Sequence, residues 1–232
     1  MELTTKIPQA HQGPVYDIDF ASPQFDSIIC SCGFDKCVYL WKNNMNSSYS
    51  KVFEYKDHTN VVTSISFSHE LKDMLLFVSC CLDGNIAIHQ YKNGTFVSQK
   101  IQAHTNGVTS VSFNPTKPMN FITCGNDYYI KVWTYVTEED NWISETLDKS
   151  ESAVKDIAYK PNDTNDTFVS CNEEGEVLLW MKKNDGKWES SSLLSHSCGI
   201  EKVSWNSNGN AMIVVSSNGE EILINEDVFN TK

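Results

Sequence analysis

The chain lacks the features that carry a protein into or across a membrane. No apolar stretch approaches the roughly 18 residues that mark a transmembrane helix. The first six residues, Met1 to Lys6, also lack the charged-then-apolar profile of a secretory signal peptide. We therefore expect the protein to stay on the cytosolic side of membranes, without direct membrane insertion.

Positive charge is scarce as well. The sequence has 18 basic residues against 30 acidic ones, which gives a formal net charge of −12 at pH 7 and a pI near 4.8. Nucleic acids and anionic membrane surfaces both require a basic face on the protein that binds them. The composition argues against both as direct partners and leaves other proteins.

Motifs for catalysis and metal binding are missing too. The sequence has no phosphate-binding glycine loop, no G-x-S-x-G elbow, no H-E-x-x-H helix and no C-x-x-C pair. Four of the eight cysteines, Cys30, Cys80, Cys124 and Cys171, recur near one position of the repeat described below, as small buried residues do. We expect reduced thiols, no catalytic residue, no cofactor and no metal site, and therefore no enzyme.

What the chain does contain is an internal repeat with a step of about 46 residues. Five segments begin with the same pattern, and their lead residues are His11, His58, His104, Ser150 and His196. Each repeat holds short runs of β-branched and aromatic residues bounded by Asn, Asp, Gly and Pro, which read as strands. Four strands fit in each period.

A period of this length that ends in Trp is typical of a blade of a β-propeller. The chain resembles the WD-repeat family, so we expect an all-β WD-repeat β-propeller with five recognisable blades in an open ring. Stacked repeats share interfaces, so residues 1–232 should form a single domain. The predicted repeats are approximately residues 11–57, 58–103, 104–149, 150–195 and 196–232, and residues 1–10 are the outer strand of a preceding or closing blade.

The family resemblance implies a hydrogen-bonded set of His, Ser or Thr, Asp and Trp in each blade. Because buried polar groups are costly unless each finds a partner, a complete set specifies one arrangement. By position, the first and third blades carry complete sets: His11, Ser31, Asp35 and Trp41, and His104, Thr123, Asp127 and Trp133.

The other three sets are incomplete. The second has His58, Ser79 and Asp83, with His89 at the Trp position; the fourth has Ser150 for the His and Glu174 for the Asp, but keeps Ser170 and Trp180; the fifth keeps His196, with Gly219 at the Asp position and Asn225 at the Trp position. Incomplete sets should give softer blades, so we expect stability to fall toward the C-terminal blade.

A closer resemblance lies in residues 13–36. There a strand ends in Phe20, a small-residue-plus-Pro turn follows, Phe25 is the next aromatic, and a small-residue strand reads Cys30-Ser31-Cys32. This segment is similar to the second blade of the SEC-thirteen family, the small propeller subunit of the COPII outer coat and of the nuclear pore Y-complex. Weaker matches follow at residues 103–105, 125–133 and 184–189.

That resemblance implies an open ring that accepts one blade in trans from a long α-solenoid partner. The expected function is a non-catalytic structural scaffold of the COPII vesicle coat in ER-to-Golgi transport, of the nuclear pore Y-complex, or of both. The partner would be the large COPII outer-coat protein or a Y-complex nucleoporin. The protein would then lie on the cytoplasmic side of the ER membrane and COPII vesicles or at the nuclear pore complex. The family's first blade has no counterpart here.

Two arrangements of the ends remain open. The strand count fills five blades if the segment from Leu3 to Ile7 completes the last blade; otherwise the ends stay apart and a partner fills the gap. An exposed strand edge invites pairing with another chain. The expected partner-binding residues are Leu3, Thr4, Thr5, Lys6, Ile7, Ile222, Leu223, Ile224 and Asn225. A closed ring would instead be an adaptor that binds peptides on its axial face through residues 12–14, 60–61 and 106–107.

Overall fold

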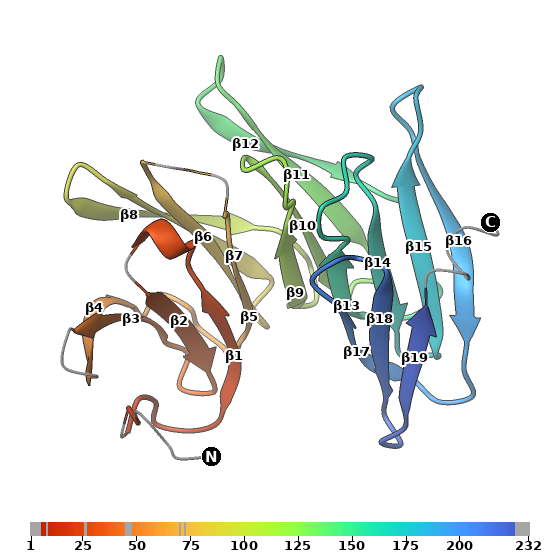
Figure 1. Cartoon of the computed structure of the whole chain (residues 1–232), viewed down its shortest axis with the longest axis horizontal. Helices are drawn as coiled ribbons and strands as arrows, with labels where there is room; N and C mark the ends of the chain where they lie inside the picture. The colour runs from red at the N-terminus through yellow and green to blue at the C-terminus, as the bar shows by residue number, and fades with distance from the viewer. Residues whose placement is uncertain are drawn as a thin grey trace.

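The computed structural model describes residues 6–7, 9–25, 27–44, 48–69, 71 and 73–225. It is all-β, with five small antiparallel sheets placed side by side along an arc (Figure 1). The predicted five-bladed β-propeller arrangement is confirmed.

Each blade runs from an inner strand outward in chain order. The first four blades have four described strands each, and the fifth has three. The strands are β1 (Val15–Phe20), β2 (Ile28–Gly33), β3 (Val38–Asn44) and β4 (Ser48–Tyr55); β5 (Val62–Phe67), β6 (Leu75–Cys81), β7 (Asn85–Lys92) and β8 (Thr95–Gln102); β9 (Val108–Phe113), β10 (Asn120–Gly125), β11 (Ile130–Val136) and β12 (Asn141–Thr146); β13 (Val154–Tyr159), β14 (Phe168–Asn172), β15 (Glu176–Lys182) and β16 (Trp188–Ser195); and β17 (Ile200–Trp205), β18 (Ala211–Ser216) and β19 (Glu221–Asn225). A short 3₁₀ helix, η1 (Pro23–Phe25), lies between β1 and β2.

The core lies between the blades. In the first cluster, Ile65 and Phe67 of β5 pack against Cys30, Val38 and Leu40 of the preceding blade. The inner strands β9, β13 and β17 make the equivalent packing on the blades before them. Each blade is therefore stabilised by its neighbours, as in other repeat proteins.

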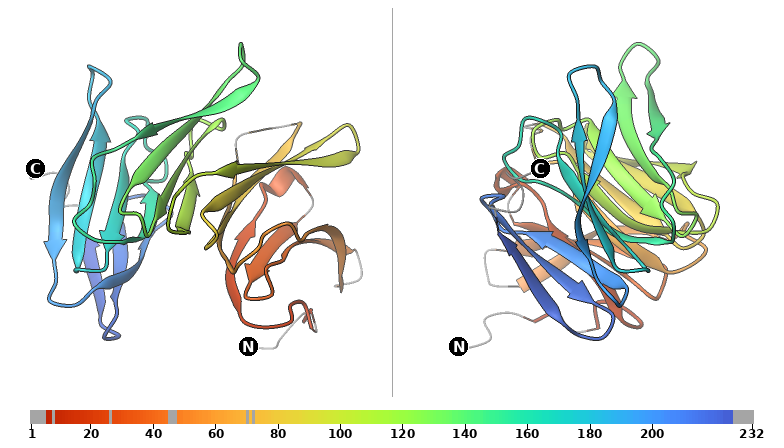
Figure 2. Two further views of the ribbon diagram at one scale, coloured as in Figure 1. Left: turned by 180° about the vertical axis from the view of Figure 1, so that it is seen from behind. Right: turned by 90° about the vertical axis from the view of Figure 1, so that its right-hand side faces the viewer.

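The ring is not closed by the described strands. The inner strands β1, β5, β9, β13 and β17 lie side by side in that order, and the first and last sheets stand at opposite ends of the arc (Figures 1 and 2). Of the predicted closing strand, Leu3, Thr4 and Thr5 lie outside the described residues. Lys6 and Ile7 are not in a strand, and Ile7 packs against Tyr39 and Trp41 of the first blade. The part of this segment that can be placed does not complete the last blade.

The strand pairing corrects our alignment of the fifth repeat. Each Trp or its replacement pairs with a residue twelve positions earlier, as in Phe121↔Trp133, and the matching pair in the last blade is Met212↔Ile224. The Trp position is thus the buried Ile224 rather than the exposed Asn225, and the Asp position is Asn218 rather than Gly219. The prediction was wrong by one residue because the turn between β17 and β18 is shorter than its counterparts.

A left-handed turn residue supports this register. In every blade the residue after the Asp position has a positive φ, from 67° to 93°. These residues are Lys36, Gly84, Tyr128, Gly175 and Gly219. Gly175 cannot be replaced without strain, because a Cβ there would lie 2.3 Å from the carbonyl oxygen of His196.

The strand register also changes which cysteine of the first blade belongs to the recurring position. Cys32, not Cys30, follows the tetrad hydroxyl directly, as Cys80, Cys124 and Cys171 do. All four are buried and free. Burial raises the pKa of the Cys80 and Cys171 thiols well above the usual value, so both stay protonated.

Candidate protein-interaction site

The inner strand of the first blade presents apolar side chains to solvent. Ile18 is 59% exposed, whereas its counterpart Ile65 in β5 is 4% exposed. Phe20 is 55% exposed, whereas its counterpart Phe67 is 1% exposed. Each of these positions in β5, β9 and β13 packs on the blade before it, and no described strand lies before β1 in this way. We call the surface formed by Val15, Tyr16, Ile18 and Phe20 the β1 face.

The backbone amides of β1 also differ from those of the other inner strands in their hydrogen-bond partners. In the next blade, the amides of Ile65 and Phe67 donate to Asp17 and Asp19 of β1, at 2.9 and 2.8 Å. The equivalent amides of Phe113, Tyr159 and Val203 likewise donate to side chains of the preceding inner strand.

With no such strand before it, β1 caps its own amides. The amide of Ile18 donates to Asp17 Oδ1 at 2.9 Å, and that of Phe20 to Asp19 Oδ1 at 2.8 Å. Burial raises the pKa of the Asp19 carboxyl. An arriving strand that carries hydrogen-bond acceptors could take over these two amides.

At the opposite end of the arc, apolar side chains of the last blade are also exposed to solvent. Leu223 of β19 is 66% exposed and its pairing partner Ile213 of β18 is 39% exposed. The same two positions in the first blade, Leu40 and Cys30, are fully buried beneath the next inner strand. Leu223 and Ile213 line a shallow hollow of about 180 Å³. We call this surface the β18–β19 face.

The structure divides the predicted partner-binding residues of the last strand. Leu223 and Asn225 reach solvent, while Ile224 is buried and Ile222 packs against the core of the fifth blade. This is the alternation of a strand with one covered side. Sequence reasoning missed Ile18, Phe20 and Ile213, although the repeat phase placed them at positions that a neighbouring blade covers.

The histidine networks of the first and third blades lie inside each sheet. His104 Nε2 and Thr123 Oγ1 are 2.9 Å apart, and Trp133 Nε1 donates to the same hydroxyl at 3.0 Å. His104 Nδ1 lies 2.8 Å from Asp127 Oδ1. In the first blade, His11, Ser31, Asp35 and Trp41 repeat this geometry at 2.8 to 2.9 Å.

The proton positions in these two networks follow from the Asp carboxylate, which can only accept, so the histidine carries its hydrogen on Nδ1 and accepts at Nε2. Trp133 donates to the Thr123 hydroxyl, this hydroxyl donates to His104 Nε2, and the Nδ1–H group of His104 donates to Asp127. Burial lowers the pKa of His104, so its ring is neutral. Although burial opposes it, hydrogen bonds from the amide of Thr105 and from His104 hold the pKa of Asp127 below its usual value.

The remaining blades depart from this network. In the second, Ser79 Oγ lies between two imidazoles, 2.8 Å from His58 Nε2 and 3.0 Å from His89 Nε2. In the fourth, Trp180 donates to Ser170 at 2.8 Å, and Glu174 makes no side-chain contact with either.

In the fifth blade, Val214 and Ile224 occupy the hydroxyl and Trp positions. His196 turns to Glu220, at 2.9 Å. An apolar pair thus replaces the polar network in this blade.

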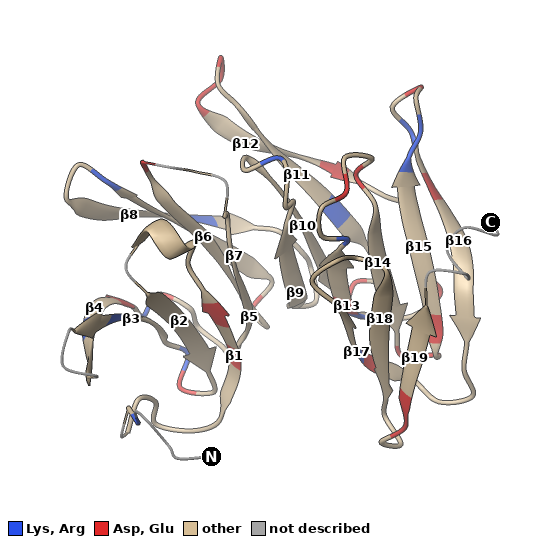
Figure 3. Ribbon diagram, viewed as in Figure 1, with Lys and Arg blue, Asp and Glu red and all other residues tan. Residues whose placement is uncertain are grey.

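The surface charge does not favour a nucleic-acid or membrane face. Lysines are scattered over several blades rather than gathered on one sheet (Figure 3). Within the part of the chain that the structure describes, no helix has the length and apolar character needed to cross a membrane. The loops expected to read peptides on an axial face are exposed at Gln12, Asn60 and Asn106, but Gly107 is buried.

Comparison with known proteins agrees with the repeat and the fold. The family model "WD domain, G-beta repeat" matches residues 2–42, 49–90 and 95–134, more than half of the chain. The chain belongs to this family of WD-repeat β-propellers.

At lower similarity, the chain is related to Sec13 proteins. It is 27% identical to "Protein transport protein sec13" of Emericella nidulans, over 95% of this chain and 79% of that protein. It is 25% identical to "Protein SEC13 homolog" of Drosophila melanogaster, over 94% of this chain and 67% of that protein. A SEC13 protein of Cryptococcus neoformans is also 25% identical, over 96% and 80%.

Proposed function

We propose that this protein is a non-catalytic scaffold subunit that accepts β-strands from an α-solenoid partner between its first and last blades. The observation that carries the proposal is the β1 face, where Ile18 and Phe20 stand exposed although their counterparts are buried. Fully burying an Ile or Phe side chain contributes about 1.5–3 kcal/mol. A partner that covers both of them gains several kcal/mol from this face alone.

The relation to Sec13 proteins supports a role in a membrane coat or pore. The partner is then the large subunit of a COPII-type outer coat or a nucleoporin of the Y-complex. The protein works on the cytoplasmic side of the ER membrane and its vesicles, at the nuclear pore, or at both. A closed peptide-reading adaptor is less well supported, because the described sheets do not close into a ring.

Co-purification tests this function. The chain is co-expressed with each candidate solenoid from the same cell, and capture is measured for the wild type and for Ile18→Asp. Burying a carboxylate in an apolar contact is costly, so Ile18→Asp should weaken capture by at least about 100-fold. The matched control is Val97→Asp, because Val97 is 61% exposed but lies on the outer strand β8.

Two sets of results distinguish a correct proposal from a wrong one. Capture of a solenoid by the wild type and by Val97→Asp, but not by Ile18→Asp, supports the proposal. Capture that Ile18→Asp leaves intact, or a wild-type chain that captures neither solenoid, overturns it. Circular dichroism of the purified variants shows that each has folded.

A further inference from the structure

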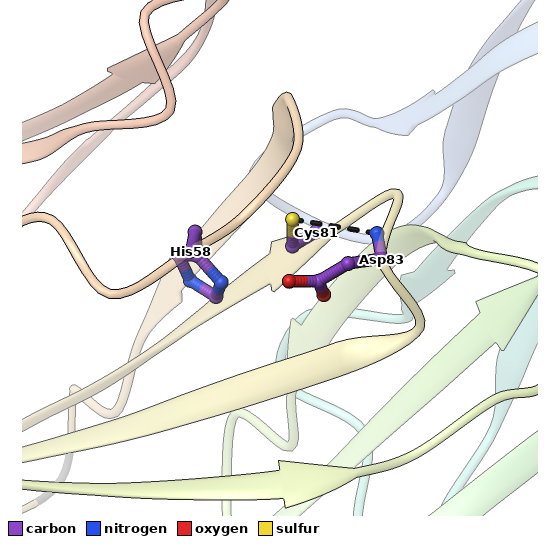
Figure 4. Close-up of side chains that lie close together, drawn as sticks. All are labelled: His58, Cys81 and Asp83. Carbon is purple, nitrogen blue, oxygen red and sulfur yellow. Dashed lines mark hydrogen bonds between the residues drawn. The ribbon is translucent and has the colours of Figure 1, made fainter.

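Within the described residues, the second blade alone contains a cluster of three potential metal ligands. A ring nitrogen of His58, the sulfur of Cys81 and a carboxylate oxygen of Asp83 all lie within 4.8 Å of one another. Figure 4 shows the imidazole and the carboxylate facing each other with the sulfur beside them. His58 is 3% exposed, and its Nδ1 atom has no hydrogen-bond partner.

Cys81 distinguishes this blade from the two that have the His–Asp hydrogen bond. Its position is occupied by Gly33 in the first blade and Gly125 in the third. A Cβ at Gly125 would lie 2.5 Å from the carbonyl oxygen of Gly107 and 2.9 Å from His104 Nδ1, and one at Gly33 would lie 2.3 Å from the carbonyl oxygen of Pro14. A side chain at this position therefore crowds the loop that carries the histidine, and in the second blade the buried His58 Nδ1 has no hydrogen-bond partner.

We propose that His58 Nδ1, Cys81 Sγ and Asp83 Oδ1 form a Zn²⁺ site. Thiolate, imidazole and carboxylate are the ligand types that zinc takes in proteins, with a fourth position left for water. The two negative charges of Cys81 and Asp83 offset the charge of the ion, in a site where Lys100 Nζ also lies 3.6 Å from Asp83 Oδ2. The ion gives the buried Nδ1 atom of His58 a partner.

The ligand atoms have capacity for a metal. Asp83 Oδ1 accepts one backbone hydrogen bond, from Asn85 at 2.9 Å, while Thr59 occupies Oδ2. Cys81 Sγ donates to the carbonyl of Asn60 at 3.2 Å and accepts from the amide of Asp83 at 3.4 Å.

Zinc binds the thiolate form of cysteine. The ion must therefore displace the thiol proton of Cys81, and zinc affinity rises with pH.

His89 can accept a hydrogen bond from Ser79, which a tryptophan at this position cannot do, because Trp can only donate to the Ser79 hydroxyl. The hydrogen-bond chain can therefore run in the opposite direction to that at His104: His58 Nε2–H donates to Ser79, Ser79 donates to His89 Nε2, and His89 Nδ1–H donates to Ser98 at 2.7 Å. This direction leaves the lone pair of His58 Nδ1 free for the metal, so His89 is a positioning residue.

Zinc titration of the purified full chain tests the site. After chelator treatment, calorimetry and elemental analysis should show one Zn²⁺ per chain, and Co²⁺ should give a thiolate-to-cobalt absorption band. Cys81→Gly recreates the environment of Gly125 and should lower affinity by at least about 100-fold, since even outer partners contribute about 10- to 100-fold. The matched control is Cys198→Ser, because this half-buried cysteine lies outside the cluster.

A second variant tests the direction of the hydrogen-bond chain. His89→Trp restores the residue of the other blades and leaves all three ligands in place, so weaker zinc binding by the folded variant supports the proposal. Equal zinc binding by Cys81→Gly and the wild type overturns the site. A wild-type chain with no stoichiometric zinc at pH 8 also overturns it. Undiminished binding by His89→Trp overturns the positioning role.

Discussion

At the scale of single residues, one substitution in the second blade changes the chemistry of its network. His89 is fully buried where three other blades have Trp, and it shares the Ser79 hydroxyl with His58. Burial lowers the pKa of His58 to about 4 and that of His89 well below its usual value. Both rings are therefore neutral in the folded protein and gain protons more readily when it unfolds.

We expect acid to destabilise the protein between about pH 6.5 and pH 4. The unfolded chain binds protons below its histidine pKa of about 6.5, whereas folded His58 does so only near pH 4, so the stability present above this window is lost as pH falls through it. The contribution of His58 is on the order of 3 kcal/mol. Thermal melts with a chelator present, from pH 8 to pH 4, measure the effect. His89→Trp removes one of the two buried histidines, so it should reduce the dependence of the melting temperature on pH. An unchanged dependence would contradict the role given to His89.

At the scale of strands and blades, the two ends of the arc differ from the middle. The inner strands β5, β9 and β13 are each covered by the preceding blade, whereas β1 is not. In the fifth blade, Val214 and Ile224 replace the hydroxyl and indole of a polar network, and no described strand covers the β18–β19 face.

We expect amide hydrogen exchange to be faster in β18 and β19 than in β10. Local stability follows buried contacts, and β10 is enclosed by neighbouring blades on both sides and holds a complete network at Thr123. Exchange mass spectrometry at neutral pH gives the comparison. Slower exchange in β18 than in β10 would refute the softening toward the C-terminal blade.

At the scale of the whole molecule, the proposed partner binding would be linked to folding, because the described strands form an open arc. Strands inserted as proposed would remove exposed apolar area from both end faces. A ligand that binds only the folded form stabilises it by about 2.7 kcal/mol at 100 times its Kd.

A solenoid fragment that carries the inserted strands should therefore raise the melting temperature. The expected rise is about 5–10 °C at that concentration for a chain of this size. Differential scanning calorimetry with increasing fragment measures it, and Ile18→Asp should show no rise. A wild-type melting temperature that does not move with the fragment counts against an obligate partner.

Much of the fold could be predicted because it is periodic. Four strands per repeat and the His11 and His104 networks depend on residues at fixed spacing within one blade. The alignment of the last blade could not be predicted, because a shortened turn shifts Asn218 and Ile224 by one position. The exposed faces at the two ends of the arc could be predicted only in part: the sequence pointed to Leu223 of the last strand, but not to Ile18 and Phe20 of the first.

The amino-acid order alone determined the blades, their number and the partners within the His11 and His104 networks, since these contacts are local and repeat with the chain. Only the tertiary structure decided which faces lack a neighbour, because burial of Ile18 or Leu223 depends on a different blade. It also decided that His58 Nδ1 has no hydrogen-bond partner beside Cys81 and Asp83, because this depends on how the three side chains are placed relative to one another.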